Sequence, residues 1–78
     1  MSAVSAVAET TEFPGSSNLE SASFDPETDT LKIVFRSGET YEYFNVPPSV
    51  YRGLQSATSA GSYFHRAIRQ RYAYDGPQ

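Results

Sequence analysis

The sequence lacks cysteine and tryptophan and has a single histidine, His65. Without cysteine, disulfide bonds and cysteine-rich zinc sites are excluded, and nothing points to an oxidising compartment. A metal site needs three or four convergent ligands. One imidazole and carboxylates that fall mostly in expected turns and in the N-terminal segment do not supply them. We therefore expect no metal and no other cofactor.

Long hydrophobic runs are lacking as well. No stretch approaches the roughly 18 to 20 apolar residues that a membrane span requires. Residues 1–8 lack the cationic start of a signal peptide and are followed by Glu9 and Glu12. We expect a cytoplasmic monomer with no membrane partner, in which 78 residues build one small core.

Large aliphatic side chains are scarce, with five Leu and Ile together against six Tyr and five Phe. Aromatic rings must therefore fill much of the core, and each buried tyrosine needs a partner for its hydroxyl. The charge is also uneven. Residues 1–44 hold two cations and eight anions, whereas residues 45–78 hold four arginines and one aspartate, within a net charge of −3. A local basic site can exist on such an acidic protein.

Composition divides the chain into three parts. Residues 1–16 are rich in Ser, Ala, Thr and Glu and predict a disordered N-terminal tail. Residues 17–75 predict one domain, and residues 76–78 a second short tail. Within the domain, Leu19 to Phe24 is a weak strand candidate, and its register stays open because Leu19, Ala22 and Phe24 do not alternate cleanly.

A β-hairpin is the clearest local signal. Leu31, Ile33 and Phe35 occupy every second position, which is the pattern of a strand with one face buried. A three-residue loop, Arg36 to Gly38, pairs Ile33 with Tyr41 and Leu31 with Tyr43, whereas a two-residue loop would place the carboxylate of Glu42 in the core. Tyr41 and Tyr43 are therefore expected in the core. The opposite, open face of the sheet would display Lys32, Val34, Thr40 and Glu42, with Phe44 as a further candidate.

Two helices should follow the strands. Pro47 and Pro48 fit a first helical turn, and the helix should run to Ser56 or Ala57. Ser59 is a candidate N-cap for a second helix reaching about Arg71. Strands followed by helices predict an α+β fold: a three-stranded antiparallel meander with two helices packed on one face.

Catalysis finds little support in the sequence. His65 is the one obvious base, and Ser59 and Ser62 are the nearest hydroxyls, but no residue pattern orients them as a nucleophile and base. The segment Ser59 to Ser62 also matches neither of the glycine-rich phosphate-binding motifs. We expect no enzyme and no catalytic residue.

The basic second helix is the best candidate for a binding site. His65, Arg66, Arg69 and Arg71 lie within seven residues, and guanidinium groups bind phosphates with two parallel hydrogen bonds. The neighbouring tyrosines Tyr63, Tyr72 and Tyr74 can stack unpaired bases. The same arginines have a purely structural interpretation, because cations near a helix C-terminus stabilise it and arginine stems cover apolar surface.

An ordered set of these features resembles the KTSC domain. The residues that carry the resemblance are Ser16 to Leu19, Leu31 to Phe35, Tyr41 to Tyr43, Val46-Pro47, Val50-Tyr51, Leu54, and Ser59 through Ile68 and Tyr72. That family is named for its occurrence at the C-terminus of some lysyl-tRNA synthetases and also occurs as a stand-alone protein. It has a central Tyr-x-Tyr and no agreed catalytic residue. The resemblance implies binding of RNA or tRNA, and together with the basic helix it predicts a weak RNA-binding module that uses His65, Arg66, Arg69 and Arg71. The alternative is a protein-interaction module that docks through the open sheet face or the basic helix.

Overall fold

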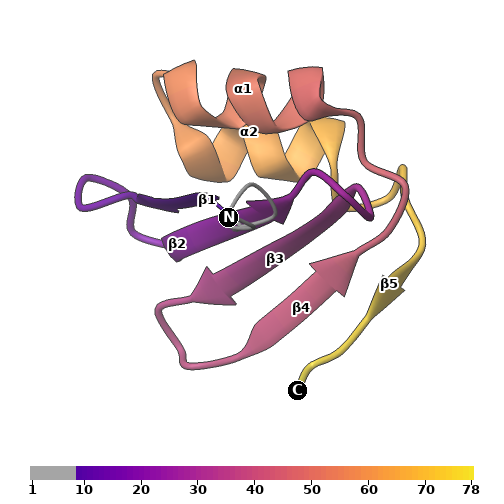
Figure 1. Ribbon diagram of the computed structural model, residues 1–78. Coiled ribbons are helices and arrows are strands. Elements are labelled where there is room, and N and C mark those ends of the chain that lie inside the picture. The colour runs from indigo at the N-terminus through magenta and orange to yellow at the C-terminus, as the bar shows by residue number, and fades with distance from the viewer. Residues whose placement is uncertain (1–8) are drawn as a thin grey trace, which may run out of the picture.

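The computed structural model describes residues 9–78, which form one antiparallel sheet with two helices over one of its faces (Figure 1). Each strand pairs with the next along the chain, in the order β1-β2-β3-β4-β5. The bounds of the elements are β1 (Glu9–Glu12), β2 (Leu19–Asp25), β3 (Thr30–Phe35), β4 (Thr40–Tyr43), α1 (Pro48–Ser56), α2 (Ala60–Ala67) and β5 (Tyr74–Asp75).

The α+β class and the one-sided packing of the helices agree with the sequence prediction, but the predicted number of three strands was wrong. The sheet has five strands, because β1 and β5 add to the edges of the predicted meander. Both added strands are short, and their pairing depends on hydrogen bonds from β2 and β4 rather than on a local hydrophobic pattern.

The ends of the packed domain differ from the predicted tails. Residues 1–8 lie outside the described residues. Glu9–Glu12 form β1, and Phe13 is only 8% exposed in the core, so the packed part begins before residue 17. At the other end, the backbone N–H of Gln78 donates to the carbonyl of Thr40 at 2.8 Å. Residues 76–78 therefore continue along β4.

The β3–β4 hairpin has the predicted register. Ile33 lies opposite Tyr41, Leu31 opposite Tyr43 and Lys32 opposite Glu42. Gly38 closes the three-residue loop with φ +98°, a backbone conformation that glycine adopts without steric cost. The two aliphatic–aromatic pairs thereby share the face of the sheet that carries the helices.

A β-bulge explains why the register of β2 could not be derived from alternation. Leu19 lies opposite Phe35 and Ser21 lies opposite Val34, which leaves Glu20 as an extra residue in the strand. The bulge shifts the side-chain alternation by one position. Leu19, Ala22 and Phe24 are consequently all buried.

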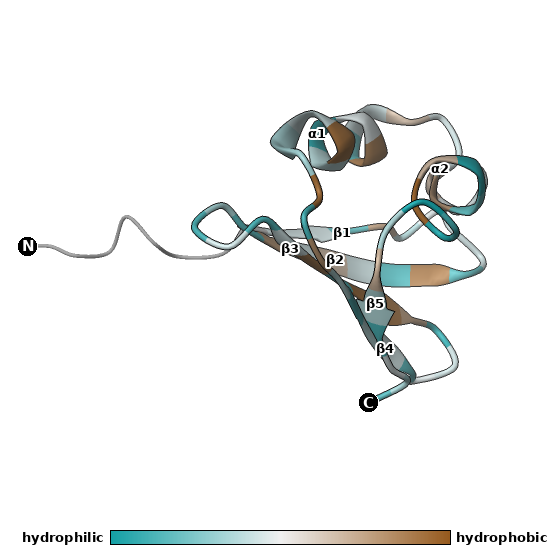
Figure 2. Ribbon diagram, turned by 90° about the vertical axis from the view of Figure 1, so that its right-hand side faces the viewer, coloured by the Kyte–Doolittle hydropathy of each residue, from teal (hydrophilic) through white to brown (hydrophobic). Residues whose placement is uncertain are grey.

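The core lies between the sheet and the helices, and Figure 2 shows α1 and α2 together above the same side of the strands. Tyr51 of α1 stacks on Phe24 of β2 with ring centroids 5.3 Å apart. The Tyr51 hydroxyl lies 2.7 Å from that of Thr11, so this buried tyrosine has its polar partner. The largest fully buried side chains are Leu19, Leu31, Ile33, Leu54, Ile68 and Val46.

The second helix begins as predicted and ends early. The Ser59 hydroxyl accepts a hydrogen bond from the N–H of Ser62 at 3.2 Å, which confirms the N-cap. The helix ends at Ala67 rather than near Arg71. The chain then turns back to the sheet, where the carbonyl of Ala73 accepts from the N–H of Phe44 at 2.9 Å. Pairing with β4 thus replaces a further helical turn.

Candidate nucleic-acid interface

A cleft of about 580 Å³ opens beside α2, between the β3–β4 hairpin and the start of β2. We call it the aromatic cleft, because five rings from three strands and one helix line it. These are Phe35, Tyr41, Tyr43, Phe64 and Tyr74. Polar and charged side chains also line it, and they are Ser17, Asn18, Arg36, Ser37, Glu39, His65, Arg69 and Gln70.

The register of the sheet positions the tyrosines. Tyr41 and Tyr43 are two residues apart on β4 and therefore share the face that carries the helices. Tyr74 of β5 lies directly opposite Tyr43. In Figure 2, β4 and β5 run down and away from α2. The rings consequently extend from the buried core to the open edge of the sheet.

Exposure increases across this row of rings. Tyr43 is 3% exposed and belongs to the core, as the sequence predicted. Tyr41 is only partly buried and packs against the core from its rim. Tyr74 is 56% exposed and presents its ring to solvent. Both rings of the central Tyr-x-Tyr therefore line the cleft, but only Tyr43 is a fully buried core residue, and the prediction of a core position holds in part for Tyr41.

The rings support one another through close contacts. The centroid of Tyr74 lies 5.7 Å from that of Tyr41 and 5.6 Å from that of Tyr43. Phe64 of α2 meets Phe35 and Tyr43 edge-on, at 5.4 and 5.6 Å. Edge-to-face and offset pairs of this kind are favourable. The exposed ring of Tyr74 is therefore backed by a packed aromatic cluster.

The hydroxyl of Tyr43 lies in an environment that disfavours its ionisation. Burial raises its pKa above the ordinary value, and the neighbouring hydroxyls of Tyr41 and Tyr74 add to the rise. The positive charge of Arg69 acts in the opposite direction. This influence means that Arg69 is close enough to the tyrosines to affect the electrostatics of the cleft.

Two of the four predicted RNA-binding residues meet at the cleft. Nη1 of Arg69 lies 3.3 Å from Nε2 of His65. The guanidinium carries no acceptor, so the imidazole nitrogen must accept this hydrogen bond. Both side chains are exposed and line the aromatic cleft. The pair forms a basic rim along its α2 side.

The other two predicted residues lie elsewhere around the end of α2. The guanidinium carbon of Arg66 sits 5.3 Å from the centroid of the Tyr63 ring, in a cation–π contact. Nε of Arg71 donates to the carbonyl of Arg66 at 3.2 Å. Arg66 lines two other hollows, and neither Arg66 nor Arg71 lines the aromatic cleft. Because α2 ends at Ala67, Arg69 lies beyond the helix. It therefore does not extend the exposed helix face on which Arg66 lies.

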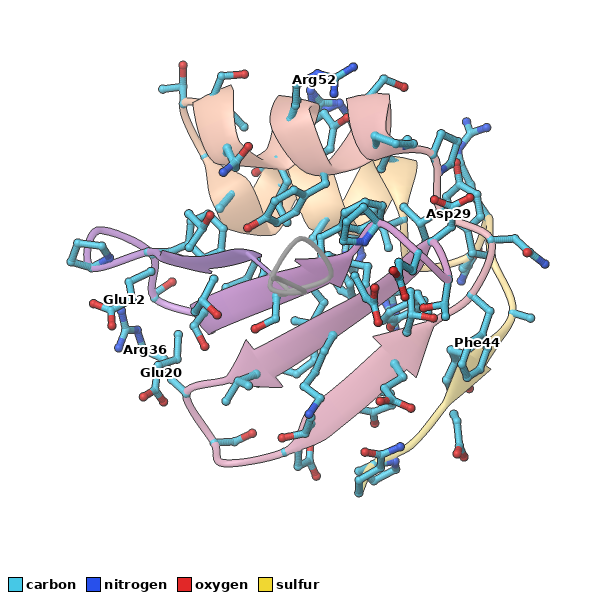
Figure 3. All side chains as sticks on the ribbon, viewed as in Figure 1. Glu12, Glu20, Asp29, Arg36, Phe44 and Arg52 are labelled. Atoms are coloured by element: carbon cyan, nitrogen blue, oxygen red, sulfur yellow. The ribbon has the colours of Figure 1, made fainter. Side chains whose placement is uncertain are left out.

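Arg36 and Glu39 come from the hairpin side of the cleft. Arg36 donates from Nε to the carbonyl of Ser16 at 2.6 Å and from Nη2 to the carbonyl of Phe13 at 2.7 Å. Figure 3 shows Arg36 at the end of the sheet where Glu12 and Glu20 also project. Its guanidinium therefore holds the β1–β2 loop in place. The exposed carboxylate of Glu39 brings a negative charge to this rim.

The open sheet face has a different character. Thr10 and Ser23 are joined by a 3.1 Å hydroxyl contact, and Lys32 lies opposite Glu42. Nε2 of Gln78 donates to Oε1 of Glu42 at 3.4 Å. Small hydroxyl and charged side chains dominate this face, so the aromatic surface of the domain lies on the helix side.

Sequence reasoning identified the residue types of the site but missed part of its wall. Phe35 was expected only as a strand residue, and Tyr74 only as a ring near the basic helix. The alternation in Tyr72-Ala73-Tyr74 is a weak strand signal that could have indicated β5. Among residues 9–78, no three His, Cys, Asp or Glu side chains gather as a metal site would require, and no helix is long and apolar enough to cross a bilayer.

Comparison with known proteins establishes the family. Residues 15–72 match the sequence model of the KTSC domain. The chain belongs to the KTSC domain family. A solved KTSC domain protein of Yersinia pestis has the same fold, with a TM-score of 0.82 and 29% identity over 88% of this chain and 96% of that one. The resemblance drawn from the sequence is thereby confirmed.

Two relatives show where KTSC domains of this kind occur. A lysine–tRNA ligase of Nostoc punctiforme is 40% identical over 62 residues, which are 80% of this chain and 11% of the ligase. An uncharacterised protein of Stutzerimonas stutzeri is 42% identical over 60 residues, or 76% of this chain and 84% of that protein. The chain therefore spans about a ninth of the ligase it matches. The similarity to the ligase is confined to a short segment of it.

Proposed function

We propose that this KTSC domain is a non-catalytic RNA-binding module that uses the aromatic cleft and its basic rim. One observation carries the proposal: the exposed ring of Tyr74, the exposed guanidinium of Arg69 and the imidazole of His65 that is hydrogen-bonded to it line the same cleft. Aromatic faces stack bases and cations bind phosphates, and proteins that bind single-stranded nucleic acid combine the two.

Transfer RNA is the RNA class with the best support. The name of the Nostoc punctiforme relative, a lysine–tRNA ligase, connects a homologous segment with a protein that acts on tRNA. An appended domain of this size can add contacts to a bound RNA by raising the local concentration of a second site. Affinity of the isolated module is then expected to be weak.

The roles of the four predicted residues differ within this proposal. Arg69 and His65 contact a phosphate at the cleft, while Arg66 and Arg71 extend the positive surface around the end of α2. With one or two phosphates neutralised, the logarithm of the affinity should fall against the logarithm of salt with a slope between about −0.7 and −1.4. Three contacts would steepen the slope to about −2.

A titration of the labelled domain with tRNA, followed by amide chemical shifts at low salt, tests the proposal. Shifts should concentrate at Tyr41, Tyr74 and residues 64–70. Arg69→Ala should weaken binding roughly tenfold, as expected when a charge-assisted hydrogen bond is lost. Arg52→Ala is the matched control, because Arg52 projects from the outer side of α1 (Figure 3). Absence of shifts at the cleft would contradict the proposal.

Docking of a protein partner on the open sheet face or the basic helix is the alternative. The open face gives it less support, because serine, lysine and glutamate are depleted at protein interfaces and aromatic residues are enriched. Absence of tRNA binding at low salt would favour this alternative.

A further inference from the structure

The geometry of the aromatic cleft points to a more specific ligand than RNA in general. We infer that the cleft holds one unstacked nucleobase against the ring of Tyr74, with the adjoining phosphate at Arg69 and His65. This inference rests on the proposed function and specifies its ligand as an unpaired nucleotide. It implies selection of loops and single-stranded ends over duplex RNA.

The platform for such a base is the outer surface of Tyr74. The side chain is 56% exposed, while its ring contacts Tyr41 and Tyr43 at centroid distances of 5.7 and 5.6 Å. The two neighbours support the ring and limit its motion, so a base that stacks on it loses little additional freedom. Stacking of this kind accepts any base, because every base has a π-face.

Charges around the cleft orient the nucleotide. Arg69 and His65 lie on its α2 side, and Arg36 and Glu39 lie on its hairpin side. The charge of Glu39 offsets that of Arg36, whose guanidinium already donates to two backbone carbonyls, so a phosphate is attracted more strongly to the α2 side. The sugar–phosphate chain should therefore pass along α2, with the base directed toward β4 and β5. One guanidinium with its hydrogen-bonded imidazole suits one phosphate, which limits the recognised unit to a single nucleotide.

The size of the cleft agrees with this unit. A volume of about 580 Å³ lies within the range of roughly 300 to 1,000 Å³ that is typical of small-ligand pockets. A paired base in an A-form helix is stacked on both faces and cannot lie flat on a side chain. Only an unpaired base can enter a concave site of this size and reach Tyr74.

The first test compares ligands. A single-stranded RNA dodecanucleotide with 2-aminopurine at a central position, the same strand in a blunt duplex, and adenosine monophosphate are titrated separately. The single strand should show a change in 2-aminopurine fluorescence and should shift the ring resonances of Tyr41 and Tyr74. Adenosine monophosphate should shift the same resonances at higher concentration, whereas the duplex should leave them unchanged.

The second test compares variants for the single strand. Tyr74→Ala should weaken binding at least about fivefold, whereas Tyr74→Phe should preserve it, because stacking requires the ring and not the hydroxyl. Tyr63→Ala is the matched control, because Tyr63 lies outside the cleft. A thermal melt of each variant establishes that it is folded.

The outcomes separate the two proposals. Equal binding of single strand and duplex, with Tyr74→Ala unaffected and Arg69→Ala weakened, would overturn the single-base site and leave RNA binding intact. Failure of tRNA, the single strand and the duplex to bind at all would overturn the proposed function and the single-base site together.

Discussion

Tyr43 and Tyr74 lie opposite each other on β4 and β5, with ring centroids 5.6 Å apart and ring planes inclined by 34°. The pair joins the core to the surface, because one ring is almost fully buried and the other is mostly exposed. The last strand, although it is only two residues long, thus provides the outer wall of the aromatic cleft.

The buried hydroxyl of Tyr43 should make stability fall at high pH. Its pKa is raised in the folded state, so the folded protein holds this proton more tightly than the unfolded chain does. The associated stability is present below the unfolded pKa of about 10 and is lost as pH rises through the folded value. Urea unfolding at pH 8 to 11 should show a smaller decline for Tyr43→Phe than for the wild type. Tyr63→Phe serves as the control, and an unchanged decline in Tyr43→Phe would contradict the assignment.

Truncation after Ala73 should remove the outer wall of the cleft and leave the domain folded. The truncation deletes the Tyr74 contacts with Tyr41 and Tyr43, for a loss of about 1 to 3 kcal/mol in unfolding free energy at typical values for aromatic pairs. The Phe44 N–H keeps its acceptor on Ala73. Circular dichroism should show a cooperative melt at lower temperature, and the tRNA titration should show lost binding. Removal of residues 77–78 alone should retain binding.

Arg36 should be important for stability rather than for RNA affinity. Arg36→Ala deletes two charge-assisted hydrogen bonds to backbone carbonyls of Phe13 and Ser16, and we expect a loss of about 1 to 3 kcal/mol. Arg52→Ala removes the same charge from an exposed helix position and should change stability by less than about 0.5 kcal/mol. Urea unfolding measures both. A loss of RNA binding in Arg36→Ala without any loss of stability would show that Arg36 acts on the ligand instead.

Gly38 should resist replacement for conformational reasons alone. Its φ of +98° is unfavourable for a residue with a Cβ, although the space around it is open. Gly38→Ala should therefore cost about 1 to 2 kcal/mol. Gly15 has equally open surroundings without a positive φ, so Gly15→Ala should be nearly neutral. Equal midpoints of chemical unfolding for the two variants would refute this explanation.

Much of the fold could be predicted because its signals are local. The alternation around Ile33 and the turn at Gly38 determine the hairpin, the prolines place the start of α1, and Ser59 places the start of α2. The edge strands could not be predicted in this way. β1 has the sequence Glu-Thr-Thr-Glu and β5 has two residues, so both depend on partners far away in the chain.

The candidate site was predictable in its residue types but not in its assembly. His65 and Arg69 were selected from the sequence and meet at the cleft. Arg66 was expected beside Arg69 because the helix was extended to about Arg71. The return of the chain to β4 ends the helix at Ala67 and brings Tyr74 to the cleft instead. The end of α2 and the position of Tyr74 thus depend on contacts between segments that are distant in the sequence.

The extra residue at Glu20 has a consequence for chain-length variation in the family. A chain without Glu20 would place Leu19 and Ser21 on consecutive rungs of an uninterrupted ladder, opposite Phe35 and Val34, with the same side chains directed inward. The principal loss would be the carbonyl that accepts the N–H of Phe13 at 3.0 Å. Deletions among KTSC sequences should therefore be tolerated here, whereas a single deletion within β3 would turn Leu31 or Ile33 toward water.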